Sequence, residues 1–335
     1  MKKKLIALLL SAAMCLSLAA CGQKDTTPST SGSGAVSGSG SAAQTKYKVG
    51  ICQLVQHAAL DAATQGFIDA LNEALPGQVE IENKNASGEA NNCGTIVNGF
   101  VSEGVDLILA NATPALTAAA SATADIPILG TSITAYGVAL DIDDFNGTVG
   151  GNISGTSDLA DLSKQADMIT EWFPETQKVG LLFCSAEPNS LYQVQEVAKY
   201  LSAKGIETQE FAFTDTNDVT AVTQAAADYA DVVYVPTDNI AASNTEAIAN
   251  VLVPAKVPAI CGEEGICAGC GVATLSISYY DLGVTTGKMA AKILTGEADI
   301  STMPVEFTEA TPKYNAAMCE TLGITPLDGY EAIEG

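Results

Sequence analysis

The sequence contains no arginine, one histidine (His57) and one tryptophan (Trp172). Without arginine, the chain cannot clamp a carboxylate or phosphate through a bidentate guanidinium. A single histidine excludes a metal site built from several imidazoles. Basic residues are also scarce, because 15 lysines face 39 acidic residues and give a formal net charge of −24. This balance argues against nucleic-acid binding and against a broad electrostatic contact with an anionic membrane.

The first 45 residues are predicted to precede the globular part. Residues 1–20 form a basic start and an apolar stretch too short for a membrane span, which indicates a signal peptide. Its end, Leu18-Ala-Ala-Cys21, resembles the lipobox of bacterial lipoproteins, so Cys21 is the expected lipid attachment site; the alternative is an ordinary signal peptide followed by a chance cysteine. Residues 21–45 are rich in Ser, Gly, Thr and Ala and predict a lipid anchor followed by a flexible linker. Loss of residues 1–20 removes three lysines, which leaves 12 against 39 acids and a charge of −27.

The remaining 290 residues are long enough to divide into two lobes. Short β-branched runs alternate with segments of helical periodicity. Predicted strands of the first half are 48–55, 79–83, 105–110 and 126–131, and predicted helices are 58–75, 90–103 and 115–123. This βαβ repetition predicts a parallel sheet with helices on both faces.

The alternation of predicted strands and helices is interrupted by a Gly-, Asp- and Asn-rich passage over 135–158 and resumes after it. Predicted strands of the second half are 178–184, 206–213, 231–236, 259–262 and 272–278, and predicted helices are 159–173, 190–204, 219–229, 241–252 and 282–294. Two similar α/β units predict two lobes with a ligand cleft between them. In such folds the ligand lies beyond the carboxyl ends of the strands.

Seven cysteines remain after Cys15 and Cys21 are set aside, and an odd number cannot all pair internally. Most lie in apolar runs, where a free cysteine packs as a small hydrophobe. Cys267-Ala-Gly-Cys270 matches a bare C-x-x-C pattern but runs into a strand-like segment, and Cys261 is the only nearby addition. The sequence therefore predicts no metal site here, and it leaves open whether Cys267 and Cys270 form a disulfide.

No catalytic motif stands out. Gly283-Val-Thr-Thr-Gly287-Lys288 is one residue short of a phosphate-binding loop and is followed by Met289, so an ordinary helix is expected. His57 has no motif-linked nucleophile. The sequence predicts neither an enzyme nor a cofactor.

Polar residues follow the predicted strands in both halves. Each could be a helix cap, but as a set directed at one cleft they favour a small polar ligand. The candidates are Gln53, His57, Thr113, Ser132, Asp158, Glu187, Asn189, Ser190, Asp238, Asn239, Glu263 and Glu264. The acids favour an ammonium group, whereas hydroxyls and helix N-termini can hold a carboxylate, so a zwitterionic amino acid fits both.

Specific roles follow as hypotheses. Asp238 or Glu264 would accept the ammonium, and Ser190 and Thr113 would hold the carboxylate. Tyr136 or Tyr280 would pack against a ring.

The chain resembles the substrate-binding lipoproteins of ABC importers, in the branch associated with tryptophan and tyrosine uptake. The segments that carry the resemblance are 48–61, 105–115, Gly155-Thr-Ser-Asp158, Glu187-Pro-Asn-Ser190, Tyr234-Val-Pro-Thr-Asp-Asn239, Gly262-Glu-Glu-Gly265, Tyr279-Tyr-Asp-Leu-Gly283 and Thr286–Leu294. The passage over 131–140 and the cysteines at 267 and 270 depart from the family pattern.

The resemblance implies a two-lobed periplasmic-binding-protein fold that closes on its ligand by a hinge and crosses between lobes three times. The expected parts are 46–155 in lobe 1, 156–279 in lobe 2, 280–303 back in lobe 1, and 304–335 on lobe 2. It also implies a monomer that is extracytoplasmic, lipid-anchored to the bacterial cell membrane, and a partner of a membrane permease. A receptor for a sugar or nucleoside and a cysteine-centred metal or redox protein remain the alternatives.

Overall fold

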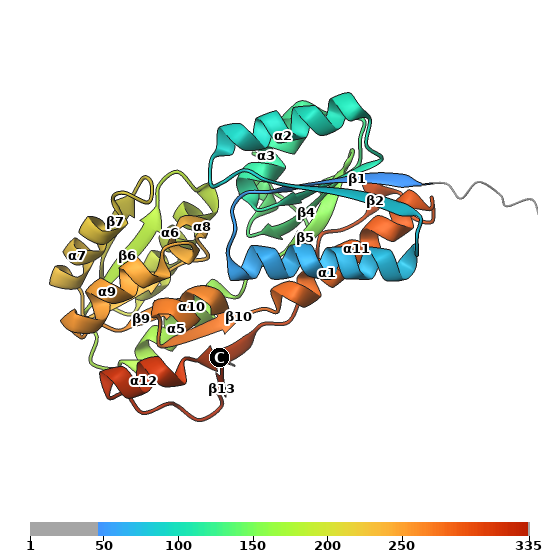
Figure 1. The fold of residues 1–335 in the computed structure, drawn as a ribbon. Helices are drawn as coiled ribbons and strands as arrows, with labels where there is room; N and C mark the ends of the chain where they lie inside the picture. Colours follow the sequence, from blue (N-terminus) through green and yellow to red (C-terminus); the bar gives the residue numbers. More distant parts are fainter. Residues whose placement is uncertain (1–45, 334–335) are drawn as a thin grey trace, which may run out of the picture. The chain divides into compact units, whose positions relative to one another are not determined.

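The computed structural model describes residues 46–333, so the predicted signal peptide, the linker and Cys21 lie outside the described residues. The described chain contains two largely parallel sheets, each covered by helices on both faces (Figure 1). The predicted two-lobed α/β fold is confirmed.

The first lobe has a six-stranded sheet in the order β11-β5-β4-β3-β1-β2, and all its strands are parallel. The strands are β1 (Tyr47–Gln53), β2 (Val79–Asn85), β3 (Leu107–Asn111), β4 (Ile128–Ile133), β5 (Ile153–Ser157) and β11 (Glu306–Phe307). Helices α1 (Ala58–Ala74) and α11 (Tyr279–Leu294) pack on one face, and α2 (Ala90–Glu103), α3 (Thr113–Ala122) and α4 (Tyr136–Ala139) pack on the other.

The central strands of this sheet are apolar on both sides, as expected for a covered parallel sheet. In β3, Leu107 and Leu109 belong to the core under α1 and α11, whereas Ile108 and Ala110 belong to the core under α2 and α3. Alternate side chains of a strand point to opposite faces, so one run of apolar residues supplies both cores.

The second lobe has a seven-stranded sheet in the order β13-β12-β10-β9-β8-β6-β7, in which only the β10–β12 pair is antiparallel. The strands are β6 (Lys178–Cys184), β7 (Glu207–Phe213), β8 (Val232–Val235), β9 (Ala259–Cys261), β10 (Ala273–Ser276), β12 (Thr311–Tyr314) and β13 (Glu331–Ala332). Helices α5 (Leu162–Trp172), α6 (Pro188–Ala203) and α12 (Ala316–Leu322) cover one face; α7 (Val219–Tyr229), α8 (Asn239–Ala242), α9 (Thr245–Ala255) and α10 (Glu264–Cys270) cover the other.

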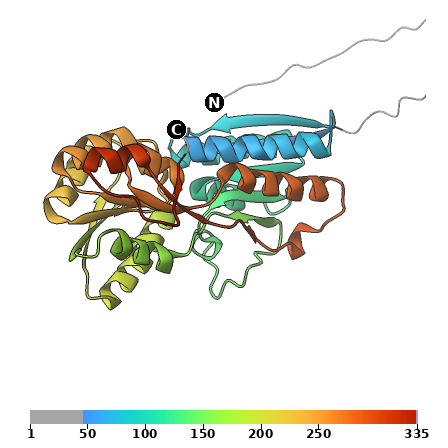
Figure 2. The ribbon, with the colours of Figure 1, turned by 90° about the horizontal axis from the view of Figure 1, so that it is seen from below.

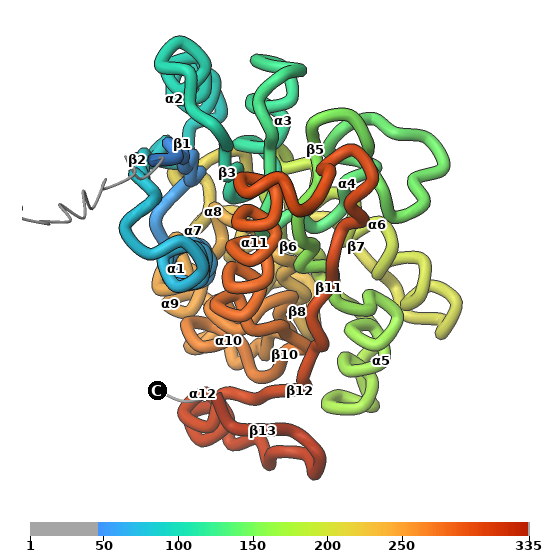
Figure 3. Tube along the Cα trace, turned by 90° about the vertical axis from the view of Figure 1, so that its right-hand side faces the viewer, coloured from blue at the N-terminus to red at the C-terminus, as the bar shows by residue number. Residues whose placement is uncertain are grey.

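The chain passes between the sheets three times, after β5, after β10 and after β11. After the second passage α11 lies beside α1 in the first lobe (Figure 2). A short 3-10 helix (Ile300–Thr302) then leads into β11, and from there the chain continues to β12 in the second lobe (Figure 3).

Two expected boundaries need correction. The boundary at 155 falls inside β5, which stays in the first sheet up to Ser157. Residues 304–335 were expected on the second lobe, but Glu306 and Phe307 pair with Thr156 and Ser157 of β5 in the first sheet. Only the part from β12 onward joins the second sheet.

Helices α1 and α11 approach until their backbones nearly touch, and glycines make this possible. A Cβ atom at Gly283 would lie 2.0 Å from the carbonyl oxygen of Ala63, and one at Gly66 would lie 2.1 Å from the carbonyl oxygen of Tyr280. The glycines of the phosphate-loop-like segment therefore belong to a helix contact, in agreement with the expected ordinary helix.

Candidate functional site

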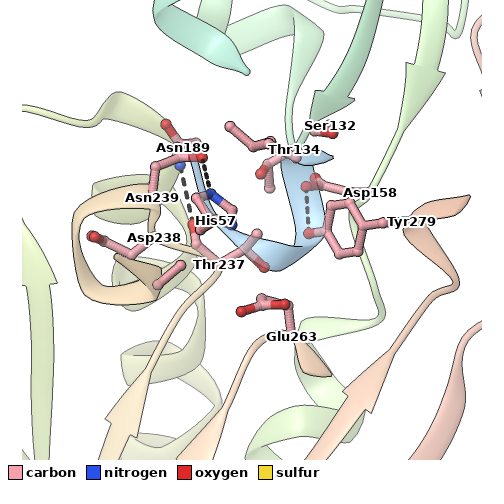
Figure 4. Close-up of a pocket in the computed structure, with 12 residues that line it drawn as sticks. His57, Ser132, Thr134, Asp158, Asn189, Thr237, Asp238, Asn239, Glu263 and Tyr279 are labelled. Carbon is pink, nitrogen blue, oxygen red and sulfur yellow. Dashed lines mark hydrogen bonds between the residues drawn. The ribbon is translucent and has the colours of Figure 1, made fainter. Parts of the chain in front are cut away.

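Residues from both lobes surround a cavity at the carboxyl ends of the strands (Figure 4). The first lobe contributes residues at the start of α1 and α11 and at or just after the ends of β4 and β5. The second lobe contributes residues that follow β8 and β9, begin α6 or lie in α8. The lining residues are His57, Leu60, Ser132, Thr134, Asp158, Asn189, Thr237, Asp238, Asn239, Ala242, Glu263 and Tyr279. The free volume is about 10 Å³, which is room for roughly one water molecule.

Ser132 reaches the cavity through an irregularity in β4. The pairing of β4 with β5 shifts register between Gly130 and Ile133, and Ser132 has a left-handed φ of 56°. A bulge of this kind re-aims a side chain, and a non-glycine residue with positive φ is strained. The Ser132 hydroxyl is buried and has no hydrogen-bond partner among the described residues.

Three of the buried acids hold backbone N–H groups in place. Asp238 accepts hydrogen bonds from the backbone nitrogens of Cys184 (2.7 Å) and Ala241 (2.8 Å). Glu187 accepts from the backbone nitrogens of Asn239 and Ile240, both at 3.1 Å. Glu263 caps α10 by accepting from the backbone nitrogens of Gly265 and Ile266. These carboxylates fix the loops that follow β6, β8 and β9.

Asp158 has a different environment. Its Oδ2 accepts a hydrogen bond of 2.9 Å from the Tyr279 hydroxyl, but its Oδ1 is buried without a partner in residues 46–333. The side chain lies in the cavity beside Thr134 and Tyr279 (Figure 4). Asp158 therefore has an acceptor oxygen available to a ligand.

Burial dominates the electrostatics of the site. It raises the pKa of Asp158, although the hydroxyls of Tyr279 and Thr134 oppose the rise, and it raises the pKa of Glu263 to about 7. Burial and the nearby Asp238 raise the pKa of Glu187 to about 8. Burial also lowers the pKa of His57, whose Nε2 is 3.3 Å from Asn239 Oδ1. The described lining residues include the carboxyl groups of Asp158, Asp238 and Glu263 and no lysine, so a bound cation would favour the charged form of these carboxyl groups and would be attracted by them.

Seven of the twelve predicted site residues line the cavity: His57, Ser132, Asp158, Asn189, Asp238, Asn239 and Glu263. Five do not. Glu187 and Ser190 lie behind the cavity. Glu187 accepts hydrogen bonds from Asn239 and Ile240, and the Ser190 hydroxyl donates to the carbonyl oxygen of Thr237. The side chain of Gln53 is hydrogen-bonded to Asp61 and Thr64 of α1. Thr113 is buried at the start of α3. Glu264 pairs with Lys313, with 2.6 Å between Oε2 and Nζ.

Neither of the two tyrosines predicted to pack against a ring lines this cavity. The Tyr136 hydroxyl is buried in the first lobe and donates to the carbonyl oxygen of Thr156, and the Tyr280 hydroxyl donates to Asp69 at the surface. Tyr279 lines the cavity instead. Helix α11 starts at Tyr279, three residues before the predicted start, and this changes which tyrosine faces inward.

Leu60, Thr134, Thr237, Ala242 and Tyr279 line the cavity but are absent from the predicted set. Thr237 directly precedes Asp238 and also follows a predicted strand, so the same reasoning that selected Asp238 applies to it. Thr134 was missed because β4 extends to Ile133, beyond the predicted end at residue 131. Leu60 and Ala242 are apolar, so a search for polar residues after strands could not find them.

The cysteines lie apart from this cavity. All seven between residues 46 and 333 are buried and unpaired, and burial raises the pKa of Cys267. Cys267 and Cys270 lie in the middle and at the end of the short helix α10, and not at the first residues of a helix, which would favour a thiolate. The strand-like segment expected after them is present as β10. The part of the chain that the structure describes contains no group of three His, Cys, Asp or Glu side chains suited to a metal ion. It also contains no helix with the length and apolar character of a membrane span.

A polar cavity at the carboxyl ends of the strands of two largely parallel sheets is the ligand-site arrangement of a substrate-binding receptor. Residues 48–329 match the family model of the ABC transporter substrate binding protein, and the chain belongs to that family.

Individual relatives agree with this assignment. A curated relative, the tyrosine-binding protein of Clostridioides difficile, is 32% identical over 317 residues, which cover 92% of this chain and 89% of the relative. A solved structure from Streptococcus pneumonia in complex with L-Trp is 30% identical and has a TM-score of 0.82, covering 86% of this chain and 100% of the other. A ligand-free, open substrate-binding protein from Clostridium difficile is 33% identical with a TM-score of 0.66, covering 86% and 99%.

Proposed function

We propose that this protein is a lipid-anchored extracytoplasmic receptor that closes its lobes on an aromatic amino acid and delivers it to an ABC permease. Membership of the substrate-binding family provides the transporter context. The relatives described as tyrosine-binding and as complexed with L-Trp support an aromatic amino acid.

The observation that carries the ligand class is the unpartnered, buried Oδ1 of Asp158 in a cavity whose described lining includes no lysine. An ammonium group placed there gains a charge-assisted hydrogen bond that no protein group makes. The hydroxyls of Ser132, Thr134 and Thr237 line the same cavity and provide donors for a carboxylate without arginine. Asp238 and Glu264, the two residues first expected to hold the ammonium, already have other partners.

Hinge closure is supported by the small size of the cavity and by the comparisons. A free volume of about 10 Å³ cannot admit an amino acid unless the lobes or side chains first move. At similar identity, the chain superposes better on the L-Trp complex than on the open, ligand-free structure. A ligand drives closure only if it binds the closed state better than the open one.

A thermal-shift panel tests the proposal. A ligand at about 100 times its dissociation constant stabilises the folded state by about 2.7 kcal/mol. L-Tryptophan, L-tyrosine and L-phenylalanine should raise the melting temperature, whereas glucose, inositol and uridine should not. Small-angle scattering with the best ligand should show a smaller radius of gyration. A shift with a sugar or nucleoside and with no amino acid would reject the proposed ligand class.

A further inference from the structure

The cavity around Asp158 is too small for a ring, but a larger space adjoins it. We call this space the flanking cavity; it has a volume of about 400 Å³, within the about 300–1,000 Å³ typical of ligand sites. Glu263 and Tyr279 line both cavities. The Tyr279 hydroxyl reaches Asp158, so the flanking cavity begins at the residue that contacts the expected ammonium site.

The flanking cavity exists because its walls carry very small side chains. Ala58, Ala59 and Ala62 of α1 form one wall, and Gly265 and Ala268 of α10 contribute to the other. In the first wall Ala59 and Ala62 pack with Ile277 and Tyr279 in an apolar cluster. A flat apolar ring fits between alanine and glycine walls of this kind. Tyr280, which was predicted to pack against a ring, also lines the flanking cavity.

One part of the flanking cavity is polar. The Glu264–Lys313 ion pair lines it, and its side chains are 30% and 25% exposed. Carboxylate and ammonium groups at this depth can accept from or donate to a polar substituent on a ring. An indole N–H or a phenol hydroxyl would find a partner here, whereas a plain phenyl ring would not.

A second neighbouring cavity fits the ligand less well. It has a volume of about 260 Å³ and lies beside Tyr136 and Phe145. Thr134 is the one lining residue that it shares with the cavity around Asp158. Ser157 and Leu159, the residues on either side of Asp158, line the second cavity, but Asp158 itself does not. Asp158 lines the cavity that it shares with Glu263 and Tyr279, the two residues that also line the flanking cavity.

We propose that the flanking cavity is the side-chain subsite of the receptor and that it selects amino acids with a polar-substituted aromatic ring. This inference rests on the proposed function, since it requires the amino-acid ammonium at Asp158. Glu264, first expected to bind the ammonium, would instead contact the ring substituent.

Cavity-filling variants test the subsite. Ala268→Trp fills it from an exposed position of α10, and Ala62→Leu fills it from α1. Val138→Trp is the matched control, because Val138 is 42% exposed and lines the second cavity. By calorimetry, both filling variants should bind L-tyrosine and L-tryptophan at least tenfold more weakly than the wild type, and their affinity for L-alanine should change less than threefold. The control should retain every affinity.

A second measurement tests the polar part of the flanking cavity, which Glu264 and Lys313 line. Glu264→Gln together with Lys313→Met should reduce the ratio of L-tyrosine to L-phenylalanine affinity by at least threefold. Melting temperatures without ligand identify any variant that fails to fold, and the remaining variants decide the result. If the wild type binds aromatic amino acids and both filling variants keep that affinity, the subsite is wrong and the proposed function stands. If the wild type binds no amino acid, the proposed function and the subsite are both wrong.

Discussion

At the scale of single residues, the four buried carboxylates around the cavity differ in their partners. Asp238, Glu187 and Glu263 accept from backbone N–H groups and hold the ends of loops, whereas Asp158 keeps one oxygen without a partner. Residue type and position after a strand cannot distinguish these two roles, because both place an acid at the same place in the sequence. The hydrogen-bond partners distinguish them.

A pair of variants separates the roles. Asp158→Asn should weaken amino-acid binding by about tenfold or more, because a charge-assisted hydrogen bond contributes roughly 1.5–3 kcal/mol. It should leave the melting temperature of the ligand-free protein unchanged or higher, since the lost charge is buried and incompletely paired. Asp238→Asn should lower that temperature, because an amide cannot accept from both backbone nitrogens as the carboxylate does.

Titration calorimetry and thermal melts check both expectations. Asp143→Asn, at an exposed aspartate, is the control. Equal affinities for the wild type and Asp158→Asn would remove Asp158 from the binding site.

The raised pKa of Glu263 predicts a pH dependence of stability. The group has an ordinary pKa of 4.5 and a folded-state pKa of about 7, so between these values the folded protein retains a proton that the unfolded chain has released. The contribution to stability is fully present below pH 4.5 and is lost as the pH rises to about 7, by at most roughly 3 kcal/mol. Urea unfolding at pH 5 and pH 7.5 should show a smaller decrease for Glu263→Gln than for the wild type. An identical decrease in both proteins would contradict the assignment.

At the scale of elements, the contact between α1 and α11 depends on the absence of side chains. Gly283→Ala would place a Cβ atom 2.0 Å from the backbone oxygen of Ala63, and the two helices would have to separate. Overpacking of this kind costs about 1–3 kcal/mol.

The matched control for Gly283→Ala is Gly99→Ala in α2, where a Cβ would meet no atom within 4 Å. That change should stabilise the protein by up to about 1 kcal/mol, because alanine favours a helix over glycine. Urea unfolding of the two variants measures both effects. Similar stabilities would mean that the helices can move apart without cost.

The sequence predicted the regular elements well and the irregular ones poorly. Strand β6 and helices α2 and α7 have the predicted bounds, because apolar periodicity and punctuating residues define them. Strand β5 was missed, since it lies within a Gly-rich passage and is held by pairing with β4 and β11. Helix α10 was missed because it is short and depends on the Glu263 cap. Tertiary contacts that no local pattern encodes decide such elements.

The same limit applies to the cavity. Strand-end polar residues were predicted because a parallel sheet gathers them at one edge, and seven of them line the cavity. The sequence pattern does not show the bulge in β4 that directs Ser132 into the cavity. It also does not show that α11 begins as early as Tyr279, which directs this side chain into the cavity. The flanking cavity is also invisible there, since it consists of the space that alanines and glycines leave.

At the scale of the whole molecule, the proposal includes a lipid at Cys21, which lies outside the described residues. If this cysteine carries the anchor, Cys21→Ala should move the exported protein from the membrane fraction to the soluble fraction. Fractionation and immunoblotting of cells that express either form measure this. Amino-acid binding should be unchanged, because the family match begins only at residue 48. A variant that remains with the membrane would reject lipid anchoring at this residue.

The three passages between the lobes also set an order of assembly. The first sheet is complete only when β11 pairs with β5, and the second only when β12 pairs with β10. Both strands lie within the last 30 residues of the chain. The chain is synthesised from its N-terminal end, so neither lobe can complete its sheet before residues 306–314 have been made and released for folding. A product that terminates early would leave sheet edges open in both lobes at once, which makes an incomplete copy prone to aggregation and proteolysis.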